Sequence, residues 1–147
     1  MEIRVFNETK RKIKKSLIER IEKEFKRTKL TGKVSKKACN LIIYTPKKIS
    51  KLNKELFDRT GHTDVISVPN PIENSDEIGD IYICLKVVED NAKRYKTTLN
   101  EEFTRIIVHG ILHLLGFQHK KSFGESNEEM FKVQEDVVRK IFINNQL

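Results

Sequence analysis

The sequence predicts an α+β fold: a single domain over residues 1–147, in which a small mixed sheet of about four strands packs against about five helices. Two kinds of apolar pattern support this fold class, because short alternating runs are typical of strands and apolar residues three and four apart are typical of helices. The length of 147 residues, without an internal repeat or an interdomain linker, fits one domain.

Four segments have the alternating or β-branched composition of strands. They are EIRVF at 2–6, ACNLIIYT at 38–45, TDVISV at 63–68 and DIYICL at 80–85. The stretch between the last two, residues 69–79, is rich in Pro, Asn and acidic residues, and we interpret it as a loop.

The predicted helices are recognised by residues that cap a helix start and by apolar residues at helical spacing. They are a helix that follows Asn7, one that begins with Thr45 and Pro46, a short one over residues 88–95, one that begins with Thr98 and Glu101, and one that begins with Ser126 and Glu129. The fourth ends at Gly116 and is apolar on nearly all sides from Ile106 to Leu115. We therefore expect it to be the central, buried helix.

Positive charge is concentrated toward the N-terminus. Residues 1–51 carry 17 Lys and Arg against 5 Asp and Glu, whereas residues 52–147 carry 12 against 16, and the net charge is +8. The basic region includes Lys12, Lys14 and Lys15. Such clustering is typical of a protein that binds a polyanion, although a solvated helix face gives the same pattern.

The sequence argues against a membrane protein and predicts a cytoplasmic one. No apolar run approaches the roughly 18 residues of a spanning helix, and the first residues lack the apolar segment of a secretory signal. Cys39 and Cys84 lie in apolar stretches without CxxC spacing, so we expect reduced, buried thiols.

Three histidines lie within the segment HGILHLLGFQH at 109–119. His109 and His113 are four residues apart, so a helix places both imidazoles on one face. Gly116 allows the chain to turn back after the helix and to bring His119 to the same point. Neutral imidazoles in this pattern fit the ligand set of one Zn²⁺ ion, which is the predicted cofactor. The alternative is that buried histidines hydrogen-bond to carbonyl groups.

A set of three histidines favours a catalytic metal site over a structural one. Structural zinc sites are usually closed by four protein ligands, whereas three ligands leave one position for water. Cys39 or Cys84 is an alternative fourth ligand, although each lies within an apolar segment. The spacing HxxxHxxGxxH resembles that of the metzincin peptidases, in which Glu follows the first histidine as general base. Gly110 occupies that position here, which weakens the peptidase interpretation.

HGILHLLGFQH, together with TDVISV and GDIYIC upstream, resembles the HGxLHLxGxDH, TDVLSF and GDI pattern of the bacterial YbeY family of endoribonucleases and ribosomal RNA maturation factors. The resemblance runs from about Leu52 to His119. It implies a zinc-dependent endoribonuclease specific for single-stranded RNA, which acts in maturation of small-subunit ribosomal RNA and in ribosome quality control. The implied partners are ribosomal RNA and the small ribosomal subunit, with neither DNA nor a membrane expected.

The resemblance also assigns site residues. It implies that His109, His113 and His119 hold the metal and that Ser67 hydrogen-bonds the substrate.

Two positions depart from the family pattern. Gln118 replaces the Asp that precedes the last histidine, and Phe57 stands where the family has a catalytic Arg. We expect Arg59, two residues later, to supply that guanidinium.

In the expected mechanism, Lys12, Lys14 and Lys15 bind the RNA backbone, and metal-activated water or hydroxide attacks a phosphodiester. Arg59 stabilises the charge that develops at phosphorus, and His62 is a further candidate acid or base. Two alternatives remain open: a metzincin-like zinc peptidase, and a ribosome-associated assembly factor with a structural zinc.

Overall fold

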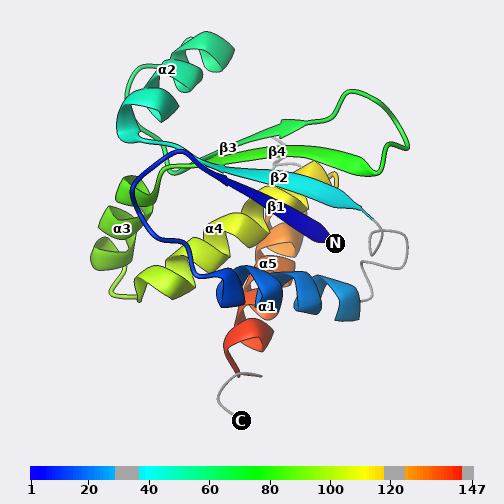
Figure 1. The fold of residues 1–147 in the computed structure, drawn as a ribbon. Coiled ribbons are helices and arrows are strands. Elements are labelled where there is room, and N and C mark those ends of the chain that lie inside the picture. The colour runs from blue at the N-terminus through cyan, green and yellow to red at the C-terminus, as the bar shows by residue number, and fades with distance from the viewer. Residues whose placement is uncertain (29–36, 118–124, 144–147) are drawn as a thin grey trace.

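The described residues form a mixed sheet with helices on both faces, which confirms the predicted fold class (Figure 1). In a computed structural model, residues 1–28, 37–117 and 125–143 are described. The elements in chain order are β1 (Glu2–Asn7), α1 (Lys15–Arg27), β2 (Ala38–Ile43), α2 (Pro46–Phe57), β3 (Val65–Pro69), β4 (Glu77–Ile83), α3 (Leu85–Arg94), α4 (Leu99–Leu114) and α5 (Glu125–Ile143).

The order of strands in the sheet is β1-β2-β4-β3, so β1 and β3 are the two edges. β1, β2 and β4 are parallel, and β3 is antiparallel to β4. α2 covers one face of the sheet, and α1, α3, α4 and α5 lie on the other (Figure 1). α4 packs against β3 and β4 on one side and against α3 and α5 on the other, which makes it the central helix that the sequence predicts.

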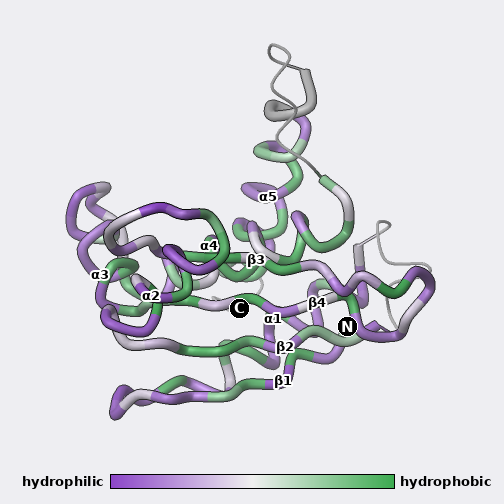
Figure 2. The backbone as a smooth tube through the Cα atoms, turned by 90° about the horizontal axis from the view of Figure 1, so that it is seen from above, coloured by the Kyte–Doolittle hydropathy of each residue, from purple (hydrophilic) through white to green (hydrophobic). Residues whose placement is uncertain are grey.

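The main core lies between the sheet and the larger group of helices. Alternation along the strands points Leu41, Ile43, Ile81 and Ile83 into it, and all four side chains are fully buried. Seen from above, β2 is mostly hydrophobic, whereas the loop between β3 and β4 is mostly hydrophilic (Figure 2). Between Glu102 and Leu112, most side chains of α4 are also buried, as its apolar sequence predicts.

A smaller apolar cluster holds α2 on the opposite face. Ile49 of α2 packs with Ile66 of β3 and with Cys84, and all three are buried. None of the helices among the described residues has the length and apolar content needed to cross a membrane.

Two predicted helix starts are confirmed. The Thr45 hydroxyl accepts a hydrogen bond from the Lys48 amide at 3.3 Å, at the start of α2. The Thr98 hydroxyl accepts one from the Glu101 amide at 3.1 Å, at the start of α4.

The predicted start of the first helix is wrong. Asn7 ends β1, and α1 begins only at Lys15. The Asn7 side chain accepts a hydrogen bond from the Thr9 amide at 3.0 Å and donates one to the Arg11 carbonyl at 2.6 Å. It therefore stabilises a turn after the strand, which is the other common role of asparagine.

Several other boundaries differ in detail from the prediction. β4 begins at Glu77, so the expected loop is shorter, and Leu85 already belongs to α3 because Cys84 is the N-cap of that helix. α5 begins at Glu125, one residue before the predicted cap Ser126, whose backbone is described but whose side chain is not.

Both cysteines are free and buried, as predicted, and their burial makes a chemical prediction. Burial raises the pKa of the Cys39 thiol to about 12, and the thiolate is the reactive form. We predict that an aromatic disulfide reagent modifies neither thiol of the folded protein at about pH 8, and that both react in denaturant. Absorbance of the released thiolate measures this; prompt reaction of a thiol without denaturant would contradict the burial.

Candidate active site

His109 and His113 lie on a partly exposed strip of the otherwise buried α4. The strip consists of Arg105, His109 and His113, which are four residues apart and therefore stack on one face of the helix. The Nε2 atoms of the two imidazoles face each other at 3.1 Å. Their rings meet edge to face, with centroids 4.6 Å apart.

Gln134 of α5 fixes the orientation of His109. Its Oε1 lies 2.7 Å from His109 Nδ1, and its Nε2 donates a hydrogen bond to the Glu135 carboxylate at 3.1 Å. Because an amide oxygen only accepts, His109 Nδ1 carries the hydrogen of this bond. In the neutral ring, the lone pair of His109 is then on Nε2, the atom that faces His113.

Arg105 holds Glu135 in place and completes a connection between α4 and α5. Its Nε and Nη2 donate to both carboxylate oxygens at 3.0 to 3.2 Å. Burial alone would raise the pKa of Glu135, but the hydrogen bonds from Arg105 and Gln134 outweigh it and keep the pKa below its usual value. Glu135 is therefore a carboxylate that fixes Gln134, which in turn orients His109.

The facing nitrogen atoms fit a metal ion. Two ligands about 2.0–2.1 Å from a tetrahedral zinc ion are about 3.3 Å apart, which is close to the observed 3.1 Å between His109 Nε2 and His113 Nε2. Because the lone pair of His109 points at His113, a proton or a cation has to lie between the two atoms. The chemistry of this donor pair is therefore compatible with zinc.

The remaining predicted ligand is not described. His119 lies outside the described residues, as does Gln118. Within residues 1–28, 37–117 and 125–143, no group of three or more His, Cys, Asp or Glu is placed to hold a metal ion. The alternative in which Cys39 or Cys84 completes the set is therefore not supported by the described part of the chain.

The turn that follows the histidine pair agrees with the prediction. α4 ends at Leu114, and Gly116 has a φ of 99°, in the left-handed region that favours glycine. The Gly116 amide donates to the His113 carbonyl and the Phe117 amide to the Leu112 carbonyl, both at 3.0 Å. These bonds satisfy carbonyl groups at the helix end and end the helix right after His113.

Gly110 lies where α4 comes closest to the sheet. A Cβ atom at this position would be 2.9 Å from Ile81 Cγ2 and 3.2 Å from Ser67 Oγ. Position 110 therefore faces the packed layer between helix and sheet, where a Glu side chain has no room. The same contact brings Ser67, a predicted substrate-binding residue, beside the residue that follows His109.

The other predicted residues lie away from the histidine pair. α2 lies on the opposite face of the sheet from α4 (Figure 1). Arg59 follows this helix by two residues, and its guanidinium carbon is 5.6 Å from the centre of the Phe57 ring. Lys12 and Lys14 precede α1 and Lys15 begins it, after β1 at the sheet edge opposite β3. The structure thus places Ser67 against Gly110, the residue that follows His109, whereas Arg59 and these lysines belong to the segments next to α2 and α1.

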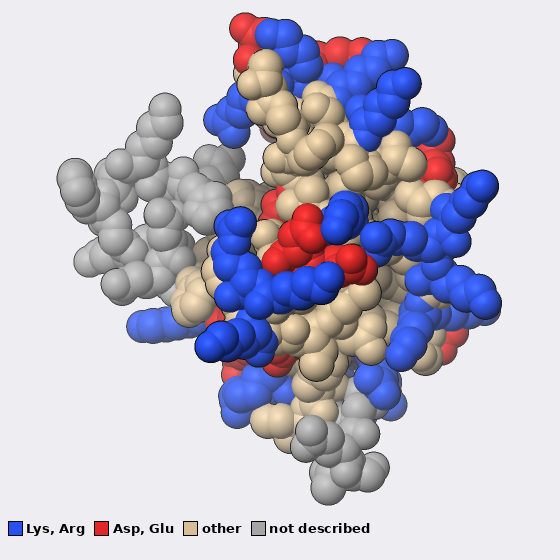
Figure 3. All heavy atoms as spheres, turned by 90° about the vertical axis from the view of Figure 1, so that its left-hand side faces the viewer, with Lys and Arg blue, Asp and Glu red and all other residues tan. Residues whose placement is uncertain are grey.

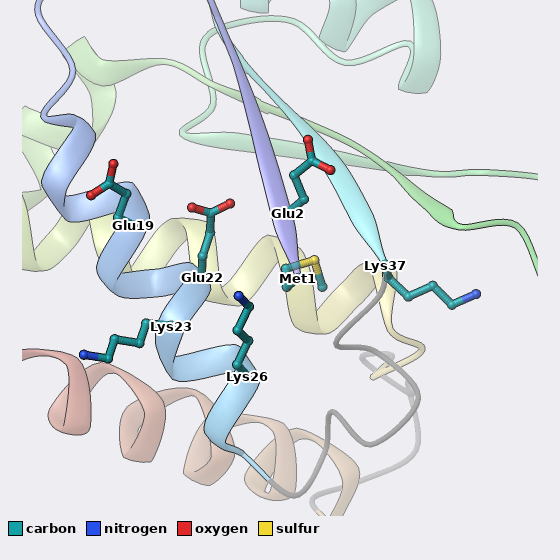
Figure 4. A pocket seen from close by; sticks show the side chains of 7 residues that line it. All are labelled: Met1, Glu2, Glu19, Glu22, Lys23, Lys26 and Lys37. Carbon is teal, nitrogen blue, oxygen red and sulfur yellow. The ribbon is translucent and has the colours of Figure 1, made fainter.

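A groove between β1 and α1 is separate from this site and encloses about 440 Å³. Glu19 and Glu22 point from α1 toward β1 in this groove, which Glu2 and three lysines also line (Figure 4). Glu22 accepts a hydrogen bond from the Ile3 amide at 2.9 Å. Acidic and basic groups balance here, so the groove does not match a polyanion.

Gln134 is the residue that sequence reasoning missed. It lies on the inner face of α5 among Met130, Val137, Val138 and Ile141, all of which are buried. A polar residue on an apolar helix face needs a buried partner, which is the signal that marks it. The sequence does not show that this partner is His109, because the two residues lie on different helices.

Fold and site together define a small α+β protein with a candidate metal centre on its central helix. The sequence model of the family Endoribonuclease YbeY matches residues 4–142. Relatives named Endoribonuclease YbeY from Thermotoga neapolitana and Thermotoga maritima are 37% and 33% identical over 142 residues, which cover 95% of this chain and 89% of each relative. The solution structure of TM1509 from Thermotoga maritima is similar with a TM-score of 0.68 and 27% identity, over 98% of this chain and 91% of that one. The chain belongs to the endoribonuclease YbeY family, as its motifs predict.

The contact at Gly110 predicts the effect of adding one methyl group. Gly110→Ala gains up to about 1 kcal/mol of helix propensity but overlaps Ile81, and such overpacking costs about 1–3 kcal/mol. We therefore expect the free energy of unfolding, measured by urea denaturation, to fall by about 1–2 kcal/mol. When Gly110→Ala is added to Ile81→Val, the loss should be smaller, because valine lacks the Cδ1 methyl that lies 3.1 Å from the Cβ position of residue 110. A Gly110→Ala protein as stable as the wild type would contradict the close packing.

Proposed function

We propose that the protein is a zinc-dependent endoribonuclease that cuts single-stranded RNA and acts in small-subunit ribosomal RNA maturation and ribosome quality control. The observation that carries the proposal is the pair of Nε2 atoms of His109 and His113, 3.1 Å apart and oriented by Gln134. Membership of the endoribonuclease YbeY family supports RNA as the substrate.

His109, His113 and His119 are the residues that would hold zinc. When bound, zinc acts as a Lewis acid toward a phosphate oxygen and makes a water molecule more acidic. Neutral imidazole ligands leave its positive charge uncancelled, which suits a phosphodiester substrate. Gln134 contributes by keeping the hydrogen of His109 on Nδ1, so that Nε2 remains a ligand.

Three further groups have proposed roles in binding the substrate. Ser67, which lies against Gly110, is the candidate hydrogen-bond donor to RNA. Arg59 is proposed to bring positive charge to phosphorus; its guanidinium is exposed but lies against the Phe57 ring, so this role requires the side chain to leave that ring and turn toward the histidine pair. Lys12, Lys14 and Lys15 are exposed and are proposed to hold the RNA backbone farther from the centre.

The alternatives differ in their support. A zinc peptidase has less support, because position 110 has no room for the general base of that class. The second candidate is a ribosome-associated assembly factor whose zinc is structural. It is favoured by the position of Arg59, because its guanidinium lies against the Phe57 ring after α2 and not on α4 with the histidines.

We expect the zinc-loaded protein to cut labelled single-stranded RNA but neither duplex RNA nor casein, and a chelator to stop the cutting until zinc is restored. His113→Ala should lose both zinc and cutting, because it removes one of the paired nitrogen atoms. His62→Ala, a histidine substitution outside the centre, should retain zinc. Gel analysis of the cut substrates and metal analysis of the proteins measure both.

Each other outcome of this experiment favours an alternative. Cutting of casein would support a peptidase. A protein that holds stoichiometric zinc and cuts none of the three substrates would support the assembly factor.

The role of Gln134 predicts the zinc affinity of two variants. Gln134→Leu removes the acceptor for His109 Nδ1, and loss of such a partner typically lowers metal affinity about 10–100-fold. Gln134→Glu keeps an acceptor for His109 Nδ1 but loses the donor to Glu135 and places two carboxylates side by side, so its zinc affinity should fall less than that of Gln134→Leu. Competition with a chromophoric chelator measures both values. A folded Gln134→Leu protein with wild-type affinity would show that this hydrogen bond does not orient the ligand.

A further inference from the structure

The outer side of α2 borders a groove whose charged lining is basic. The groove lies between α2 and the loop at residues 60–62 and has a volume of about 760 Å³. Lys47, Lys51 and Lys54 line it together with Ser50, Thr60 and His62, and none of its lining residues is acidic. This differs from the groove between β1 and α1, in which carboxylates balance the lysines.

The lysines of this groove form one stripe along α2. A helix places residues on one side when they lie three, four and seven positions after the first. This spacing holds for Lys47, Ser50, Lys51 and Lys54. Ile49 lies on the opposite side of α2, in the apolar cluster that packs on the sheet. The stripe therefore faces away from the core, and Lys and Arg side chains lie at the top of Figure 3, where α2 is, with some Asp and Glu among them.

The charges of the stripe are available to a ligand. Lys51 lies 4.0 Å from Glu55 and Lys54 lies 2.5 Å from Asp58, but these pairs are exposed to solvent and contribute little. Within the described residues, Lys47 has no ion pair. A bound polyanion would therefore gain the attraction of all three lysines without breaking a buried contact.

His62 adds a hydrogen-bonding group to the second wall. Its Nδ1 lies 3.1 Å from the Pro46 carbonyl oxygen, which only accepts, so Nδ1 carries the hydrogen. In the neutral ring, Nε2 is then an acceptor on the side away from Pro46. Together with the hydroxyls of Ser50 and Thr60, it offers partners to the 2′-hydroxyl groups that distinguish RNA from DNA.

We propose that this groove binds the sugar–phosphate backbone of single-stranded RNA, with Lys47, Lys51 and Lys54 on successive phosphates. At about 1.5 Å rise per residue the stripe is about 10 Å long, enough for about three phosphates of one strand. Thr60 directly follows Arg59, so the groove ends beside that residue, and RNA bound there approaches the protein on the α2 side of the sheet. The inference rests on the proposed endoribonuclease function.

The test compares two triple variants of the full chain that remove the same charge. One is Lys47→Gln, Lys51→Gln, Lys54→Gln; the matched control is Lys93→Gln, Lys96→Gln, Lys132→Gln, at exposed sites outside the groove. Fluorescence anisotropy with a labelled single-stranded RNA, in chelator to prevent cutting, gives Kd over a range of salt concentrations. Circular dichroism confirms that both variants are folded.

We expect the groove variant to bind RNA about tenfold or more weakly and its salt slope to fall by about 2, since each phosphate contact on a single strand contributes about 0.7. The control should change neither quantity to this extent. Equal losses of affinity in both variants, or unchanged affinity in the groove variant, would overturn the proposal that this groove binds RNA. The proposed function would still be supported if the wild-type protein cuts single-stranded RNA. A wild-type protein that neither binds nor cuts this RNA would overturn both.

Discussion

The close packing of α4 against the sheet is the constraint on which the rest of the structure depends. Gly110 has no side chain, so α4 approaches β4 until Ile81 fills the space where a Cβ would lie. This contact turns the buried side of α4 to the sheet and leaves a strip with Arg105, His109 and His113 at the margin of the core. The same helix therefore completes the hydrophobic core and positions the histidine pair.

α5 supplies what α4 cannot provide alone. An imidazole on a helix can carry its hydrogen on either nitrogen, and a metal ligand needs the lone pair on the correct one. Gln134 makes this choice for His109, and Glu135 and Arg105 hold Gln134 in place. Because Gln134 is buried, rotation of His109 would leave its amide oxygen without this partner in the interior, which is unfavourable. The histidine pair is thus oriented by the packing of two helices.

The sequence predicts the parts of this arrangement that depend on local pattern. Apolar spacing and capping residues identify α2 and α4, and the spacing of the histidines places two of them on one helix face. The sequence predicts Asn7 as a helix cap, but asparagine is equally common in turns. Only the fold decides between the two roles, and here Asn7 stabilises a turn. The bond between Gln134 and His109 depends on a contact between α4 and α5, two helices from different parts of the chain. A single sequence does not contain the geometry of such contacts.

The claim that two oriented imidazoles form a zinc site can be tested at their nitrogen atoms. Long-range ¹H–¹⁵N NMR spectra distinguish protonated, unprotonated and metal-bound imidazole nitrogens, and can be recorded before and after one equivalent of zinc. We predict that His109 is protonated at Nδ1 in both states, and that zinc shifts the Nε2 signals of both His109 and His113. Stoichiometric zinc that leaves these Nε2 signals unchanged would contradict the central claim.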